Sequence, residues 1–191
     1  MLQRLRLRFD VVSPDVDESP LANETPEALA LRLSVAKAQA VSRQHPDCLV
    51  IGSDQVATID GRSLGKPGTH AAAVAQLQQL SGREVVFHTA LTVTDGRSEK
   101  TEDVITTCVF RELSDTEIQT YLLADQPYDT AGSAKAEMLG IALMQRISSD
   151  DPTAIVGLPL IALSNMLRHF GLNPVDPPAG WSVDTTGTHS A

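Results

Sequence analysis

The stretch 50–67, VIGSDQVATIDGRSLGKP, combines a carboxylate and a lysine in a pattern that could serve phosphate chemistry. The apolar residues 49–51 predict a buried strand, and Asp54 follows at its end. Side chains in this position face the crevice at the edge of an α/β sheet. Lys66 comes twelve residues later between a glycine and a proline, as suits a lysine that contacts phosphate. For Asp54 taken alone, a turn-forming cap is the commoner interpretation.

Further charged residues shift the balance toward a site for a divalent cation and a phosphate. Glu18 lies in the acidic loop 14–24, and two carboxylates from separate loops are the minimum for holding a hard cation against a phosphate. Lys37 interrupts a run of small apolar residues, so it is either a surface lysine or a cation directed into the site. Glu137 is either an exposed loop acid or a residue that faces a ligand.

Common catalytic motifs give no alternative. The sequence has no P-loop, because Gly65-Lys66 is followed by a proline, and it has no dinucleotide-binding glycine motif or nucleophile elbow. The five histidines are scattered and make no metal-ligand pair at helical spacing. We interpret the stretch 150–153, DDPT, as a helix-capping turn. Function must therefore depend on carboxylates and lysines.

The elements that position these residues alternate between helices and single strands. Thr25 and Pro26 are of the types preferred at a helix start, and Ser114 with Glu117 has the capping-box pattern. Turn signals at 60–61 and 95–96 predict reversals of the chain, the second within a hairpin. We expect strands at 7–13, 48–54, 84–94 and 101–111, and helices at 26 to about 45, 70–80, 115 to about 124 and up to about 170. This order predicts an α/β fold with a mixed, twisted sheet flanked by helices.

Length and composition indicate how many domains the chain can form and which kinds of partner it disfavours. The 191 residues, 42% of them apolar, suffice for one domain at 1–175, followed by a disordered tail at 176–191. The formal charge of −9 argues against binding of nucleic acid, and no window is apolar enough to span a membrane. Cys48 and Cys108 lie in apolar runs without metal-ligand spacing, so we expect buried free thiols and a cytoplasmic location.

Seven short motifs, in their order and spacing, resemble the Maf family of nucleoside triphosphate pyrophosphatases from residue 1 to about 174. They are DVDES (15–19), RLSVAKA (32–38), IGSDQV (51–56), LGKP (64–67), LSG (80–82), DTAGSAKAE (129–137) and VGLPL (156–160). Gln55, together with the stretches 131–141 and 150–163, is similar to the subgroup that acts on 7-methylguanosine triphosphate.

The resemblance implies a two-lobed fold with a central cleft, and hydrolysis of a nucleotide between its α and β phosphates. It implies that Mg²⁺ or Mn²⁺ is required. It makes Asp54 the proton acceptor and a metal ligand, with Glu18 as the second metal ligand. Residues at the positions of Lys37 and Lys66 help to hold the metal and the phosphates.

The same resemblance assigns the choice of base to Gln55 and Glu137. N7-methylation gives guanine a positive charge, and a carboxylate at Glu137 would favour such a base. We therefore expect a small-molecule nucleotide, 7-methyl-GTP, as the substrate. The alternatives are a pyrophosphatase for other non-canonical nucleotides and a catalytically impaired nucleotide-binding regulator of septum formation. A homodimer is compatible with each of these.

One part of the family pattern has no counterpart in the chain. Family members begin with a strand and a loop of the type Ser-x-Ser-Pro-x-Arg-Arg, whose hydroxyls and arginines contact the triphosphate, followed by a helix. The first residues, MLQRL, match that helix from its middle onward. A start codon assigned too late and a short chain that lacks these phosphate contacts are the two explanations. The abruptness of the cut favours the first.

Overall fold

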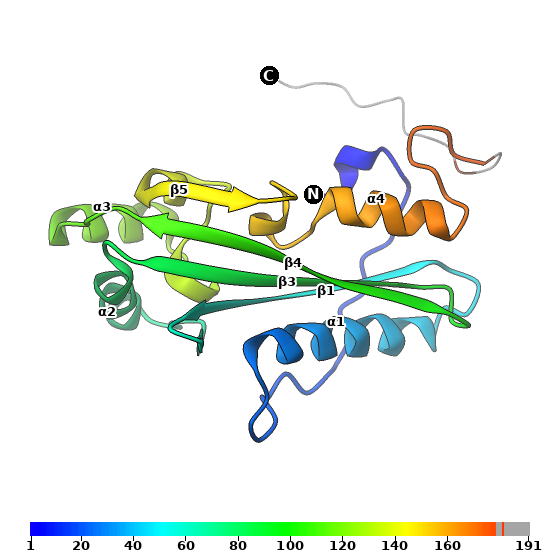
Figure 1. Cartoon of the computed structure of the whole chain (residues 1–191), viewed down its shortest axis with the longest axis horizontal. Helices are drawn as coiled ribbons and strands as arrows, with labels where there is room; N and C mark the ends of the chain where they lie inside the picture. The colour runs from blue at the N-terminus through cyan, green and yellow to red at the C-terminus, as the bar shows by residue number, and fades with distance from the viewer. Residues whose placement is uncertain (179–180, 182–191) are drawn as a thin grey trace.

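The computed structural model describes residues 1–178 and 181, and its centre is one five-stranded sheet (Figure 1). The strands lie in the order β2-β1-β3-β4-β5. They are β1 (Val50–Ile59), β2 (Arg62–Leu64), β3 (Glu84–Thr94), β4 (Glu99–Phe110) and β5 (Met144–Ser149). The α/β class predicted from the sequence is confirmed, since helices flank this sheet.

The pairing of the strands corrects one detail of the prediction, because all four pairings are antiparallel rather than mixed. β1 and β2 are joined by a tight turn at Asp60 and Gly61, whose φ angles of 50° and 72° suit a two-residue hairpin. A second hairpin joins β3 to β4. Each hairpin reverses the chain, and the long connection through α3 also returns β5 antiparallel to β4.

Four α-helices flank the sheet, and the caps predicted from the sequence are confirmed. The Thr25 side chain accepts a hydrogen bond of 3.2 Å from the backbone nitrogen of Ala28, and Ser114 and Glu117 form a reciprocal capping box. The α-helices are α1 (Pro26–Ser42), α2 (His70–Leu80), α3 (Asp115–Asp125) and α4 (Leu160–His169). Short 3-10 helices are η1 (Leu2–Leu5), η2 (Ala131–Ser133), η3 (Leu139–Leu143) and η4 (Ala154–Val156).

The core divides along the length of the sheet. α1 and α4 cover opposite faces of one half, whereas α2 and α3 lie together at the other end (Figure 1). One buried cluster, which includes Leu77 and Tyr121, lies at the α2–α3 end. Two others lie between the sheet and the remaining helices, and include Leu163 of α4 and Leu33 of α1. This division is consistent with the two-lobed architecture that the sequence predicts.

One edge of β1 is uncovered by any described strand over most of its length. β3 pairs with residues 50–58 of β1, but on the other edge β2 pairs only with residues 57–59. An apolar groove of about 490 Å³ lies beside the uncovered part and is lined by Leu7, Ile51 and Leu158 among others. An uncovered edge is unusual for a central strand, because its backbone groups remain open to another chain.

Three further expectations from the sequence are wrong. Asp54 does not end a strand but lies in the middle of β1, because the strand continues through Gln55 as far as Ile59, just before the turn at Asp60 and Gly61. Residues 7–13 form no strand, because the segment makes no hydrogen-bonded ladder with an edge of the sheet. Only Leu7 among them is buried. Cys48 is exposed in the turn before β1, whereas Cys108 is buried, and burial raises the pKa of its thiol to about 12.

The predicted tail at 176–191 lies outside the described residues, apart from 176–178 and 181. Among the described helices, none is long and apolar enough to cross a membrane.

Candidate active site

Three charged side chains from separate parts of the chain meet where α1 packs against β1. Lys37 projects from the middle of α1, and its Nζ atom lies 2.6 Å from Oδ1 of Asp54 on β1. The same nitrogen lies 2.7 Å from Oε1 of Glu18, in the loop before α1. The exposed fraction is 20% for the Lys37 side chain, 12% for Asp54 and 51% for Glu18. The structure thus brings together three of the residues that the sequence singled out.

The contact between Lys37 and Asp54 depends on a close approach of α1 to the sheet. Gly52 lies on the same face of β1 as Asp54, because side chains two residues apart in a strand point the same way. A Cβ atom at Gly52 would overlap the carbonyl oxygen of Ser34 in α1. The buried hydroxyl of Ser34 also bonds the Thr92 hydroxyl of β3 at 2.9 Å. Glycine at position 52 therefore lets α1 lie low enough for Lys37 to reach β1.

The loop that carries Glu18 is held by an ion pair that sequence reasoning missed. The Arg32 Nε atom lies 2.6 Å from Oε1 of Glu24, and its Nη2 atom lies 2.8 Å from Oε2. Nη2 also donates a hydrogen bond of 3.0 Å to the carbonyl oxygen of Ser19. Such paired guanidinium–carboxylate bonds are strong and directional. Helical spacing could not reveal this pair, because Glu24 precedes the helix that carries Arg32.

Burial and neighbouring charges tune the ionisation of the cluster. Burial raises the pKa of Asp54 and the nearby Glu18 charge acts in the same direction, while the hydrogen bond and charge of Lys37 oppose them. The hydrogen bond with Lys37 lowers the pKa of Glu18. Burial disfavours the Lys37 charge, but its bonds to Asp54 and Glu18 outweigh burial and raise its pKa. Two carboxylates thus share one bonded cation, which favours the binding of a further cation.

Lys66 lies within electrostatic range of the cluster without bonding to it. It follows β2 in the loop before α2, and its side chain is exposed. Its charge lowers the pKa of both Glu18 and Asp54, as the smallest of the contributions to each. Within the described part of the chain Lys66 forms no ion pair. Its ammonium group is therefore available to a phosphate.

The two residues expected to select the base do not join this cluster. Gln55 follows Asp54 on β1 and therefore points to the opposite face of the sheet. There its Nε2 atom lies 2.9 Å from the Thr89 hydroxyl oxygen and 2.9 Å from the carbonyl oxygen of Ala154. Glu137 is exposed in the segment between η2 and η3. No hydrogen bond or ion pair joins it to the Lys37 cluster in the described structure.

The donor set of the cluster fits a hard divalent cation. Asp54 and Glu18 each use one carboxylate oxygen on Lys37, and their second oxygens accept no hydrogen bond from the described residues. Mg²⁺ is usually held by one or two carboxylates, with waters and substrate phosphates as its remaining ligands. Among the described residues no three His, Cys, Asp or Glu side chains group to hold a metal. The cluster therefore suits a cation that arrives with a phosphate ligand.

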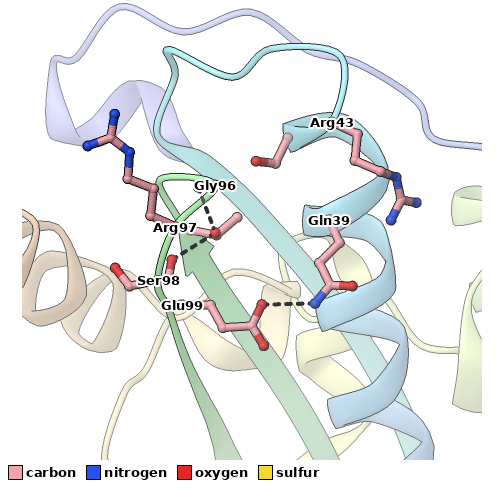
Figure 2. Close-up of a pocket in the computed structure, with 8 residues that line it drawn as sticks. Gln39, Arg43, Gly96, Arg97, Ser98 and Glu99 are labelled. Atoms are coloured by element: carbon pink, nitrogen blue, oxygen red, sulfur yellow. Dashed lines mark hydrogen bonds between the residues drawn. The ribbon is translucent and has the colours of Figure 1, made fainter.

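A second cavity, of about 360 Å³, contains none of the predicted site residues. Its walls come from the end of α1 and the turn between β3 and β4 (Figure 2). Arg43 and Arg97 point away from each other there, and Gln39 donates a hydrogen bond of 3.0 Å to Glu99 (Figure 2). Because its cations do not converge, this cavity is not the candidate active site.

Comparison with known proteins shows the family to which the chain belongs. The family model described as Maf-like protein matches residues 1–170, and the chain belongs to this family. It is 66% identical over 179 residues to the 7-methyl-GTP pyrophosphatase of Bordetella avium (strain 197N), covering 94% of this chain and 91% of the relative. Proteins of the same name from Burkholderia thailandensis and Cupriavidus pinatubonensis are 59% and 58% identical. Those matches cover 98% and 90% of this chain, and 89% and 87% of the relatives.

Proposed function

We propose that the protein hydrolyses 7-methyl-GTP to 7-methyl-GMP and diphosphate, and so keeps a modified nucleotide from being incorporated. Water adds to the α phosphorus, and diphosphate leaves with the oxygen that bridged the α and β phosphates. The observation that carries the proposal is the cluster of Glu18, Lys37 and Asp54. It occurs in a chain whose relatives, at 66% to 57% identity, bear the name 7-methyl-GTP pyrophosphatase.

Asp54 is the residue that accepts the proton of the attacking water. Its raised pKa makes it a stronger base than an exposed aspartate, while Lys37 helps to keep it ionised. A carboxylate general base typically contributes about 10² to 10⁴ in rate. Lys37 holds Oδ1, which leaves Oδ2 of Asp54 for the water.

Phosphate and metal would be held by the other members of the cluster. Glu18 and Asp54 are the two carboxylates that would hold Mg²⁺ or Mn²⁺. When bound, such a cation neutralises charge on the phosphate oxygens. Lys66 contacts the outer phosphates as an exposed cation on a short loop, and Lys37 keeps the two carboxylates together.

Gln55 and Glu137 are the residues that we propose for base selection. A carboxylate near the base would favour the positive charge of N7-methylguanine over plain guanine. Glu137 is exposed, so a ligand can reach its carboxylate. No ion pair with a described residue neutralises its charge. Replacing Glu137 by glutamine should therefore reduce the preference for the methylated nucleotide.

The proposed substrate also bears on location and partners. A free nucleotide as substrate supports a cytoplasmic location, and the net charge of −9 disfavours nucleic acid as a partner. We further propose a homodimer, which light scattering of the purified protein would test.

Release of diphosphate from a panel of nucleotides tests the proposal. Purified protein should release diphosphate from 7-methyl-GTP faster than from GTP, ATP or UTP, and only with Mg²⁺ or Mn²⁺ present. A preference for unmethylated nucleotides would select the broader pyrophosphatase instead. Tight nucleotide binding without turnover would select a binding protein that has lost catalysis.

A further inference from the structure

The Gln55 side chain sits in a hydrogen-bond network that determines which of its two polar atoms has no partner among the described residues. Its amide group contacts the Thr89 hydroxyl on β3 at 2.9 Å and the Ala154 carbonyl oxygen in η4 at 2.9 Å. The Ile155 carbonyl oxygen lies further away, at 3.4 Å. The Thr89 hydroxyl oxygen itself lies 3.1 Å from the Ala154 carbonyl oxygen. Gln55 is half-buried and Thr89 is fully buried.

The chemistry of these partners allows one orientation of the amide. A carbonyl oxygen only accepts hydrogen bonds, so the Gln55 atom beside Ala154 must be the donor Nε2. The Thr89 hydroxyl has one hydrogen, which it donates to Ala154, and it therefore accepts the second Nε2 hydrogen. Both amide hydrogens are thus committed. The Gln55 Oε1 atom accepts no hydrogen bond from any described residue and is left as the group that Gln55 can offer to a ligand.

We propose that Thr89 is a positioning residue for base selection, because it holds Gln55 so that only its carbonyl oxygen is presented to the bound nucleotide. This inference rests on the proposed function and on Gln55 contacting the base. A presented acceptor requires a donor on the ligand. At positions 1 and 2 guanine carries N1–H and N2–H₂ donors, whereas adenine has an acceptor at N1 and only C2–H, and its N6–H₂ donor lies where guanine has O6. A site built for hydrogen bonding strongly rejects a ligand that leaves its polar group unpaired.

The same acceptor also suits the methylated base. The positive charge created by N7-methylation withdraws electron density from the ring, so N1–H becomes a stronger donor. A neutral carbonyl oxygen at Gln55 would then bond 7-methylguanine more strongly than guanine. Glu137 could add a preference for the charge, but the requirement for a ring N–H would come from Gln55 and Thr89.

Thr89→Val tests the proposal, because it keeps the shape of the buried side chain and removes the hydroxyl. The ratio of kcat/KM for 7-methyl-GTP over ATP should fall by about 5- to 50-fold, through loss of discrimination rather than of kcat. Thr89→Ser should retain the wild-type ratio within about twofold. Thr106→Val is the matched control, since Thr106 is fully buried in the neighbouring strand and bonds Ser149 instead of Gln55. An unchanged ratio in Thr89→Val would overturn the proposal.

A second measurement separates this inference from the proposed function. In the wild-type protein the Gln55 side-chain NH₂ signal, observed by NMR with ¹⁵N labelling, should exchange with water at least about tenfold more slowly than that of an exposed glutamine. Exchange at the rate of an exposed glutamine would overturn the inference, even if Thr89→Val did not fold. A wild-type protein with no turnover would count against the proposed function alone. In that case, the Thr89→Val test would compare the dissociation constants for 7-methyl-GTP and ATP in place of the two kcat/KM values.

Discussion

Each face of the sheet holds a largely buried aspartate, and the two carboxylates are used in opposite ways. On the α1 face, Asp54 accepts one hydrogen bond, from Lys37, and lies beside a second carboxylate. On the α4 face, Asp151 is 2% exposed and accepts bonds of 3.0 and 2.7 Å from the backbone nitrogen and hydroxyl of Thr153. Its other oxygen accepts bonds of 2.6 and 3.2 Å from the first turn of α4, at Ile161 and Ala162.

The difference separates a carboxylate that is available for chemistry from one that serves the fold. Asp151 uses both oxygens on fixed donors at a helix N-terminus, where negative charge is also favoured by the helix dipole. Asp54 keeps one oxygen without a described partner, and burial raises its pKa. A carboxylate oxygen without a partner, close to a second carboxylate, can take up a cation, so Asp54 marks a site that a ligand completes.

The strongest test of this comparison is Asp54→Asn, which keeps the size of the side chain and removes the base. Turnover of 7-methyl-GTP should fall by about 10² to 10⁴, while the free energy of unfolding changes little. Diphosphate release and urea unfolding measure the two effects. Asp103→Asn is the matched control, because Asp103 lies in the same row of the sheet and contacts His88 rather than Lys37. Retained turnover in Asp54→Asn would remove Asp54 from the mechanism.

For Asp151→Asn we expect the opposite result, a loss of stability with turnover retained. An asparagine amide would turn an N–H group toward backbone N–H donors, so the free energy of unfolding should fall by about 2–3 kcal/mol. At temperatures where the variant is folded, kcat should stay within a few-fold of wild type. A large loss of kcat without loss of stability would mean that both aspartates serve catalysis, and the comparison would fail.

Gly52→Ala tests whether the charged cluster depends on the close approach of α1. The added Cβ overlaps the Ser34 carbonyl oxygen, so we expect a loss of about 1–3 kcal/mol in the free energy of unfolding. Gly65→Ala is the control, because a Cβ there meets no atom within 4 Å. Its effect should stay within about 0.5 kcal/mol. Equal stability of the two variants would show that α1 can shift without strain.

Lys37→Met tests how strongly this lysine controls the ionisation of Asp54. Lys37 lowers the pKa of Asp54, so its removal should move that pKa upward, and titration of the carboxyl ¹³C signal in metal-free protein measures the shift. Lys66→Met should move the same pKa upward by less, because the contribution of Lys66 is the smallest. A larger shift in Lys66→Met would reverse the assigned roles of the two lysines.

The smallest effect is expected at the ion pair that holds the Glu18 loop. The hydrogen bond from Arg32 lowers the pKa of Glu24 from 4.5 to about 2. Its stabilising contribution is therefore present above pH 4.5 and is lost as the pH falls toward 2. Wild type and Glu24→Gln should differ in thermal stability at pH 7 and converge near pH 2. Glu102→Gln, at an exposed position of β4, should show no such convergence.

Much of the local structure could be predicted from the sequence. The caps at Thr25 and Ser114, the turn at Asp60-Gly61 and the span of α2 follow from short-range rules, and the structure confirms them. Residues 7–13 have strand-like composition but form no strand, because a strand also needs an edge to pair with. Local propensity could not decide that.

The sequence by itself determined which chemical groups the protein has, since the types and order of Glu18, Lys37, Asp54 and Lys66 already pointed to phosphate and a divalent cation. Only the tertiary structure decided how they combine. It placed one lysine nitrogen between two carboxylates, because the helix approaches the strand closely at Gly52. It also separated Gln55 from its neighbour Asp54, because consecutive strand residues face opposite sides of a sheet and the partners on the second side are largely backbone carbonyls. Backbone carbonyls are common to every residue, so their positions depend on the fold and leave no mark in the sequence.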